Sequence, residues 1–226
     1  LRYSVTPPTQ ATEDALFSGQ IDDLEIGGIT KVTVASQSPR PLGIFQDQKD
    51  ITGEIRWAFD ATYNSHTGEY QIRSGKTPEV WCRLVYSEVS GPILIEAKIE
   101  AEYPTSVAGP AAFLIMTDEL SILPPSFYIA YVRSNGQTKG EWRTSANYAP
   151  QITGWRGAYD GQVRLVREGK SVSMFYRNTE TQQWTLHDAR EIELADPIYV
   201  GLGAWSPEQH DMVVGHFWDV QLTRPA

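Results

Sequence analysis

The stretch that decides the fold class is Ile93-Leu94-Ile95-Glu96-Ala97-Lys98-Ile99-Glu100. Its odd-numbered residues are all apolar, whereas its even-numbered residues from position 96 onward are charged. Because successive side chains of a β-strand point to opposite faces, this alternation predicts a strand with one face in a core and one face in water. Similar alternation predicts further strands near 21–26, 30–35, 55–60, 69–73, 80–87, 112–117, 127–133, 162–167, 171–177, 198–204 and 216–223.

Polar turns separate these predicted strands. Examples are Ser90-Gly91-Pro92, Ser134-Asn135-Gly136, Tyr159-Asp160-Gly161 and Glu168-Gly169-Lys170. Gly169 predicts a tight hairpin, since glycine adopts a positive φ without steric cost. No amphipathic helix of three turns interrupts the pattern. Many short strands with frequent turns predict an all-β, two-sheet antiparallel jelly-roll sandwich.

The length of the chain suits one sandwich with an N-terminal extension. The 226 residues include 41% hydrophobic residues, which is enough to build a core. We expect residues 1–30 to form an N-terminal tail and strand, and residues 31–226 to form the sandwich. The segments 19–26 and 215–222 share a pattern of glycine, apolar residues and aspartate. Either they are neighbouring strands at one edge of the sandwich, or the first is the closing strand of a preceding domain.

The charge balance excludes two classes of partner. With 19 Lys+Arg against 28 Asp+Glu, the net charge is -9, which repels nucleic-acid phosphates and anionic lipid surfaces. No stretch approaches the roughly 20 apolar residues of a membrane-spanning helix, so we expect no membrane insertion. The single cysteine, Cys82, is interpreted as a small buried hydrophobic residue. The chain begins at Leu1 rather than at methionine, and we expect an extracellular or cell-surface location.

A set of segments occurs in an order that indicates a known type of module. The segments are Ile44–Ile51, Gly68–Gly75, Trp81, Leu84–Tyr86, Gly91–Ile99, Val163–Lys170, Phe175-Tyr176, Trp184 and Pro197–Leu202. Over about residues 44–223 the chain resembles bacterial concanavalin A-like lectin or glucanase-type modules, of the kind found at the C-terminus of β-xylosidases. The resemblance implies a jelly roll of two stacked antiparallel sheets. The matching positions are mostly packing positions, so they indicate the fold rather than the ligand. Thr77–Trp81 stands where such modules often have Asp-Ile-Trp-Gly, so no role of that aspartate is carried over.

Aromatic residues in polar surroundings predict a carbohydrate partner. The chain has 7 Trp and 11 Tyr, and a sugar ring stacks its C–H face on an exposed aromatic plane. Glycines next to Trp205 on its strand face would open a trough over the sheet. The predicted ligand-binding residues are Trp142, Arg143, Tyr148, Trp155, Arg156 and Trp205. The alternative for these aromatics is surface packing, or a second buried face for Trp205. Trp57, Trp184 and Trp218 are interpreted as packing residues.

These observations favour a non-catalytic carbohydrate-binding module of a secreted or surface protein, with a polysaccharide or glycan as its partner. A structural or assembly protein of the cell surface is the alternative, because exposed aromatics equally suit contacts with another copy or a neighbouring domain. A glycan-active hydrolase or lyase is a second alternative. It needs paired carboxylates. Asp23 with Glu25 is the nearest pattern, although Gln20 occupies its leading position.

No organic cofactor and no catalytic metal is predicted. The histidines at 66, 187, 210 and 216 lack ligand spacing within one element, and the sequence has no nucleophile elbow or phosphate-binding glycine loop. The carboxylates of Asp22, Asp23 and Asp219 could hold a structural calcium ion together with loop carbonyls. The competing interpretation is a plain acidic strand end.

Overall fold

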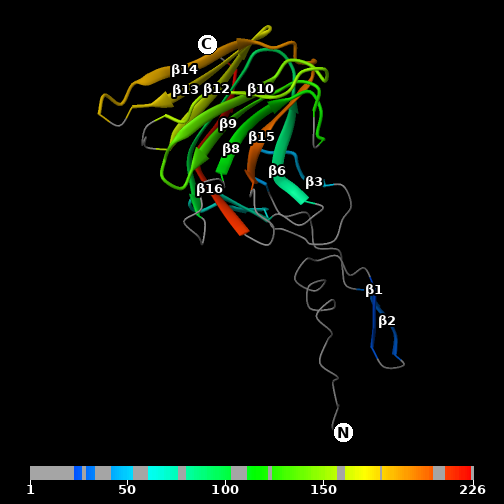
Figure 1. The fold of residues 1–226 in the computed structure, drawn as a ribbon. Helices are drawn as coiled ribbons and strands as arrows, with labels where there is room; N and C mark the ends of the chain where they lie inside the picture. The colour runs from blue at the N-terminus through cyan, green and yellow to red at the C-terminus, as the bar shows by residue number, and fades with distance from the viewer. Residues whose placement is uncertain are drawn as a thin grey trace. The chain divides into compact units, whose positions relative to one another are not determined.

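The computed structural model describes residues 23–26, 29–33, 42–52, 61–75, 80–102, 111–121, 124–156, 161–178, 180–205 and 212–224 (Figure 1). The chain divides into two units, Leu1–Pro41 and Leu42–Ala226. In the first unit, β1 (Asp23–Ile26) pairs with β2 (Ile29–Thr33) as an antiparallel hairpin. The boundary expected between residues 30 and 31 therefore falls inside β2.

The described residues of the second unit form two seven-stranded antiparallel sheets, named sheet 1 and sheet 2 below. Sheet 1 has the order β11 (Gln151–Ile152), β10 (Thr138–Arg143), β9 (Phe127–Arg133), β8 (Ala111–Thr117), β15 (Ile198–Trp205), β6 (Val80–Val89) and β3 (Asp47–Thr52). Sheet 2 has the order β14 (Trp184–Glu191), β13 (Ser171–Arg177), β12 (Gln162–Glu168), β7 (Ile93–Glu102), β16 (Met212–Thr223), β5 (Glu69–Gly75) and β4 (Ala61–Asn64). This architecture confirms the prediction of an all-β, two-sheet jelly-roll sandwich. Within the described ranges, no helix is long and apolar enough to cross a membrane.

The hydrophobic core lies between the two sheets. Alternate residues of each strand point into it, so that Ile95 of β7, Leu165 of β12 and Leu202 of β15 are fully buried. Burying one such side chain contributes about 1.5–3 kcal/mol. The charged residues that alternate with the core residues of β7, among them Glu96 and Lys98, lie on the outer face of sheet 2.

Several strands depart from the sequence prediction. The strands β3, β4, β10, β11 and β14 are additional, and the predicted strand 55–60, with Trp57, lies outside the described residues. In β10 the inward residues are Thr138, Gly140 and Trp142, so its hydrophobic alternation is weak. Of the two alternatives for segments 19–26 and 215–222, the structure contradicts the one in which they are neighbouring strands at one edge, because among the described strands β16 is flanked by β7 and β5 while β1 pairs with β2.

A buried tyrosine anchors the segment that precedes β3. The hydroxyl of Tyr70 in β5 accepts a hydrogen bond from the Ile44 N–H at 2.8 Å, and the Tyr70 ring meets Phe45 edge-on with centroids 5.4 Å apart. Gly43 has a φ of +61°, and a Cβ added there would overlap the Tyr70 hydroxyl. Burial raises the pKa of Tyr70, so the phenol stays protonated in its role as acceptor. Glycine is therefore required at position 43 by both backbone and packing.

One buried arginine ties together loops at an end of the sandwich. Arg167 of β12 is 6% exposed. Its guanidinium donates to the carbonyl oxygens of Gly91 at 3.4 Å and Ala195 at 3.2 Å, and lies 3.6 Å from the Asp196 carboxylate. The Asp196 carboxylate also accepts a hydrogen bond from the Gly91 N–H at 3.1 Å. One buried side chain thus donates to carbonyl oxygens of two loops.

Polar residues close the side of the sandwich where β14 ends sheet 2. Tyr128 of β9 donates a hydrogen bond to Asp188 at 3.0 Å, and Asp188 pairs with Arg190 at 2.7 Å. His187 lies where the register of β14 shifts against β13, and its Nε2 is 2.9 Å from the Thr153 hydroxyl. Burial, assisted by a nearby arginine and opposed by Asp188, lowers the pKa of His187. These contacts join the two sheets through polar groups at the edge.

Candidate functional site

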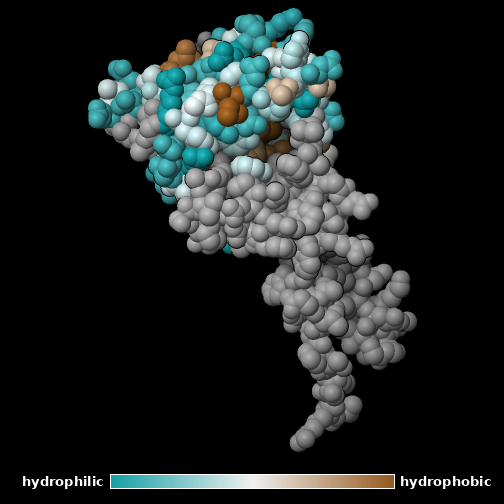
Figure 2. Space-filling model, viewed as in Figure 1, coloured by the Kyte–Doolittle hydropathy of each residue, from teal (hydrophilic) through white to brown (hydrophobic). Residues whose placement is uncertain are grey.

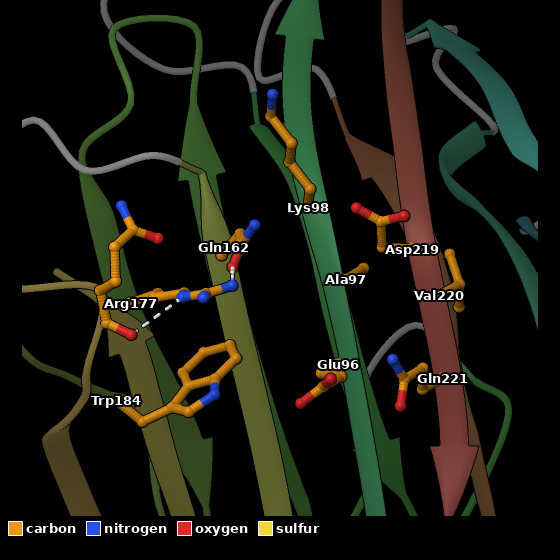
Figure 3. Close-up of a pocket in the computed structure, with 10 residues that line it drawn as sticks. Glu96, Ala97, Lys98, Gln162, Arg177, Trp184, Asp219, Val220 and Gln221 are labelled. Atoms are coloured by element: carbon orange, nitrogen blue, oxygen red, sulfur yellow. Dashed lines mark hydrogen bonds between the residues drawn. The ribbon is translucent and has the colours of Figure 1, made fainter. Parts of the chain in front are cut away.

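An open groove of about 550 Å³ lies on the outer face of sheet 2 (Figure 3). It is lined by Glu96, Ala97, Lys98, Gln162, Arg177, Gln182, Trp184, Asp219, Val220 and Gln221. All of these except Gln182 belong to the neighbouring strands β14, β13, β12, β7 and β16. The site is therefore built on the sheet itself, where side chains are held more rigidly than on loops.

One row of side chains crosses this groove because the strands are in register. Trp184 lies opposite Arg177, and Gln162 lies opposite Lys98. A hydrogen bond of 2.8 Å from Arg177 Nη1 to Gln162 Oε1 joins the two halves of the row (Figure 3). Directly opposed residues of antiparallel strands share a face. The four side chains therefore form a continuous row from the edge strand to the middle of the sheet.

Trp184 supplies an aromatic wall whose orientation is held by an ion pair. The guanidinium carbon of Arg164 lies 4.1 Å from the centroid of the Trp184 ring. Arg164 is in turn fixed by Glu96, to which its Nε donates at 2.6 Å. Trp184 is only half-buried, so part of its ring remains accessible from the groove. A ring that is held by a cation and keeps part of its surface accessible is suited to stacking on a ligand.

A β-bulge in β16 brings Asp219 to the outer face. The register shifts between Trp218, opposite Lys98, and Gln221, so Asp219 and Val220 share one position on the partner strand. Asp219 has a φ of 53°, in the left-handed region that is unfavourable for residues other than glycine. Val220 packs against the core, and both Trp218 and Asp219 consequently face outward. Bulges of this kind re-aim side chains next to functional sites.

The groove combines an aromatic plane with balanced charges. Its lining holds two carboxylates, Glu96 and Asp219, and two cations, Lys98 and Arg177. In the part of the chain that the structure describes, the Asp219 carboxylate makes no hydrogen bond or ion pair, and it is exposed. It can accept hydrogen bonds from a ligand. An uncharged molecule with many hydroxyls and one apolar face matches this set of groups.

The structure corrects the prediction that Trp142 presents an exposed ring. Trp142 is 6% exposed and belongs to the core. Its ring stacks on Tyr128 with centroids 6.2 Å apart, and the guanidinium of Arg190 lies 4.2 Å from its centroid. Alternation along β10 points Trp142 inward. The Arg143 guanidinium is occupied with carbonyl oxygens of the turn at 145–148, at distances of 2.6–3.1 Å.

Trp155 and Trp205 lie on the outer face of sheet 1, on the opposite side of the sandwich from the groove. The guanidinium of Arg133 is 3.6 Å from the Trp155 centroid, and the ring of Tyr131 is 6.4 Å from that of Trp205. The ammonium of Lys139 links the two pairs. It lies 4.7 Å from the ring centroid of Tyr131 and 5.1 Å from that of Trp155. The structure thus connects these two tryptophans with each other but not with Trp142.

The predicted trough beside Trp205 is wrong. A Cβ added at Gly203 would overlap Phe113 and Leu84, because these side chains already fill the space above the glycine. Both Phe113 and Leu84 are 2% exposed. The remaining predicted ligand residues, Tyr148 and Arg156, are exposed. Their part in binding, like that of Trp155 and Trp205, stays a prediction.

Exposed large apolar side chains are scattered among the described residues. They are Ile44, Tyr148, Ile152 and Leu186. On the face drawn in Figure 2, hydrophobic residues form small patches separated by hydrophilic surface. Apolar residues that are exposed singly are normal for a monomeric protein. This face therefore gives no support to the alternative of an assembly protein.

The predicted calcium ligands are divided between the two units. Asp22 lies outside the described residues, Asp23 belongs to β1 of the first unit, and Asp219 belongs to β16 of the second. No group of three His, Cys, Asp or Glu residues that could hold a metal ion occurs in the described ranges. A structural calcium ion stays a prediction. The residues that line the groove all belong to the second unit.

The sequence interpretation misses the groove because it assigns Trp184 and Trp218 to packing. Both are half-buried on the outer face of sheet 2. The alternation of β7 does place Glu96 and Lys98 on the solvent side, but their neighbours across the strands depend on sheet order. A polar outer face that also carries two tryptophans is the signal that could have indicated a site.

No family model matches the chain, and no curated protein matches its sequence. Among solved structures, a protein of unknown function from Saccharomyces cerevisiae is similar with a TM-score of 0.58 at 12% identity, over 74% of this chain and 92% of the other. A mutant of the GH43 protein BlXynB from Bacillus licheniformis is similar with a TM-score of 0.53 at 13% identity, over 70% of this chain and 33% of that chain. Both likenesses support the two-sheet sandwich fold. At these identities the likeness shows the fold alone, and no sequence family confirms the β-xylosidase-type module.

Proposed function

We propose that the sandwich is a non-catalytic carbohydrate-binding module of an extracellular or surface protein, and that its site is the groove of sheet 2. The observation that carries this proposal is the Trp184 ring, held by Arg164 at the end of a row of hydrogen-bonding side chains. The ring offers a stacking plane, and the row offers donors and acceptors for sugar hydroxyls. The fold is compatible with this function and does not by itself decide it.

The carboxylates of the groove argue for binding without cleavage. Glycoside hydrolysis, by either stereochemical course, uses a pair of carboxyl groups flanking the scissile bond. Glu96 is engaged by the Arg164 guanidinium. Of the two acidic residues in the groove lining, Asp219 alone is therefore unengaged within the described part of the chain. The groove thus offers Asp219 to a sugar hydroxyl, while Glu96 supports Trp184 through Arg164, and this division favours binding over cleavage.

The test is retention of the full chain on a panel of polysaccharides, followed by calorimetric titration with the best ligand. Trp184→Ala should weaken binding by about 1–3 kcal/mol, as expected for an aromatic residue that dominates a binding site. The comparison variant is Trp155→Ala, which removes a half-buried indole from the outer face of sheet 1, where the sequence predicts a site. If the ligand binds in the groove of sheet 2 instead, this variant should bind like the parent. Loss of binding in Trp155→Ala with retention in Trp184→Ala would move the site to sheet 1. Failure of the parent to bind any polysaccharide would refute the proposal.

A further inference from the structure

The row of side chains in the groove continues beyond it to a second tryptophan. Lys98, which lies opposite Gln162 on one side, lies opposite Trp218 of β16 on the other. One row thus runs from Trp184 through Arg177, Gln162 and Lys98 to Trp218, across five neighbouring strands. Because neighbouring strands are about 4.8 Å apart, the first and last strands of this row are separated by about 19 Å.

Trp218 is held in place in a manner similar to Trp184. Its ring is stacked on His216, with an interplanar angle of 11° and centroids 5.7 Å apart. The His216 ring is fixed in turn by Glu69, whose carboxylate lies 2.7 Å from Nδ1. The Lys98 ammonium is 5.9 Å from the Trp218 centroid, on a flexible stem that a ligand can displace. The bulge at Asp219 keeps Trp218 and the exposed Asp219 carboxylate on the same outer face.

We propose that the ligand is an extended, uncharged glycan chain that lies across the strands and stacks on both tryptophans, with Trp218 as a second subsite beyond the groove. This inference rests on the proposed carbohydrate-binding function and specifies its ligand class. A single sugar stacked on Trp184 does not reach the Trp218 strand about 19 Å away. Apart from Gln182, the groove lining consists of strand residues only, so the row crosses an open sheet face where the middle of a chain can lie.

The charges favour an uncharged chain over an acidic one. The lining carries two carboxylates and two cations. The Arg177 guanidinium already donates hydrogen bonds to Gln162 and to the Gln182 carbonyl oxygen. The chain as a whole has a net charge of -9, which repels a polyanion. Hydroxyl groups, in contrast, can use both the donors and the acceptors of the row.

The experiment is calorimetric titration of the full chain with cello- and xylo-oligosaccharides of one to six sugars, with polygalacturonate as the acidic comparison. Affinity should rise with the number of sugars until both tryptophans are covered, because the second contact is made at high effective concentration. Trp184→Ala should weaken binding at every length. Trp218→Ala should weaken only the long oligosaccharides, by about tenfold, and leave the short ones unchanged. Trp218→Phe, which keeps an aromatic plane and protects the fold, should recover most of the loss.

The outcomes separate this inference from the proposed function. If short sugars bind through Trp184 while Trp218→Ala binds all lengths like the parent, or if polygalacturonate binds more tightly than the neutral chains, the extended neutral ligand is refuted and the carbohydrate module stands. If the parent binds neither the neutral oligosaccharides nor polygalacturonate, both are refuted. Circular dichroism of each variant should match that of the parent, so that a change in affinity reports on the site.

Discussion

Replacement of Trp142 distinguishes a core residue from a ligand-binding residue, which the sequence alone does not do. The side chain is 6% exposed, stacks on Tyr128 and lies under Arg190. Truncation of a buried tryptophan to alanine costs about 3–5 kcal/mol, because it removes apolar contacts and leaves a cavity. At about 2–4 °C per kcal/mol for a domain of this size, Trp142→Ala should lower the Tm by about 6–20 °C.

Urea unfolding followed by circular dichroism measures this loss. The midpoint should fall while the slope against urea stays the same, since the surface exposed on unfolding changes little. Trp184→Ala is the matched control. It removes a half-buried indole with one cation contact, so it should cost only about 1 kcal/mol of stability but should weaken retention on polysaccharide. A Trp142→Ala variant with an unchanged midpoint and lost retention would show that the assignment of these two tryptophans is reversed.

Other features give predictions that stability measurements check. Gly43→Ala should lower the free energy of unfolding more than Gly91→Ala. Both glycines have a positive φ, which costs alanine about 1–2 kcal/mol, but of the two only Gly43 has a neighbour, the Tyr70 hydroxyl, that the added Cβ would overlap. Equal losses of stability would contradict the packing argument. The lowered pKa of His187 means that the unfolded state binds a proton first as the pH falls, so the free energy of unfolding should decrease below about pH 6.5; His187→Gln should show a smaller decrease, and an identical pH profile would refute the assignment. Arg167→Met should cost about 1–3 kcal/mol, because the loop carbonyls lose their buried donor; thermal unfolding at parental temperature would show that water replaces the guanidinium.

The fold class is predictable because, in a half-buried strand, the alternation of apolar and polar residues follows the alternation of buried and exposed faces. The strands β7 and β12 both follow it, with buried residues at every second position. The sequence does not predict β10, because Thr138 and Gly140 occupy two of its inward positions and the apolar alternation is lost. The sequence does not predict β14 either. It is an edge strand, and its inward residues include Asp188 and Arg190, which face a polar cluster rather than the apolar core.

The site is less predictable because it is made by strand order and by one bulge. Lys98, Gln162 and Trp218 come from distant parts of the chain and become neighbours only once β7 lies between β12 and β16. Strict alternation along β16 would also place Val220 on the same face as Trp218. The bulge reverses the faces after Trp218, which sends Val220 into the core and leaves Asp219 outside.

The polar edge at β14 has a consequence for how the groove can stay open. A terminal strand exposes unpaired backbone groups that attract strands from other molecules. In β14, Asp188 and Arg190 point inward and the register shift at His187 interrupts the ladder. An incoming strand would have to extend a ladder that is already bent and lined with charge. Trp184 begins this same strand. An edge that resists strand addition therefore also leaves the Trp184 end of the groove without an added strand beside it.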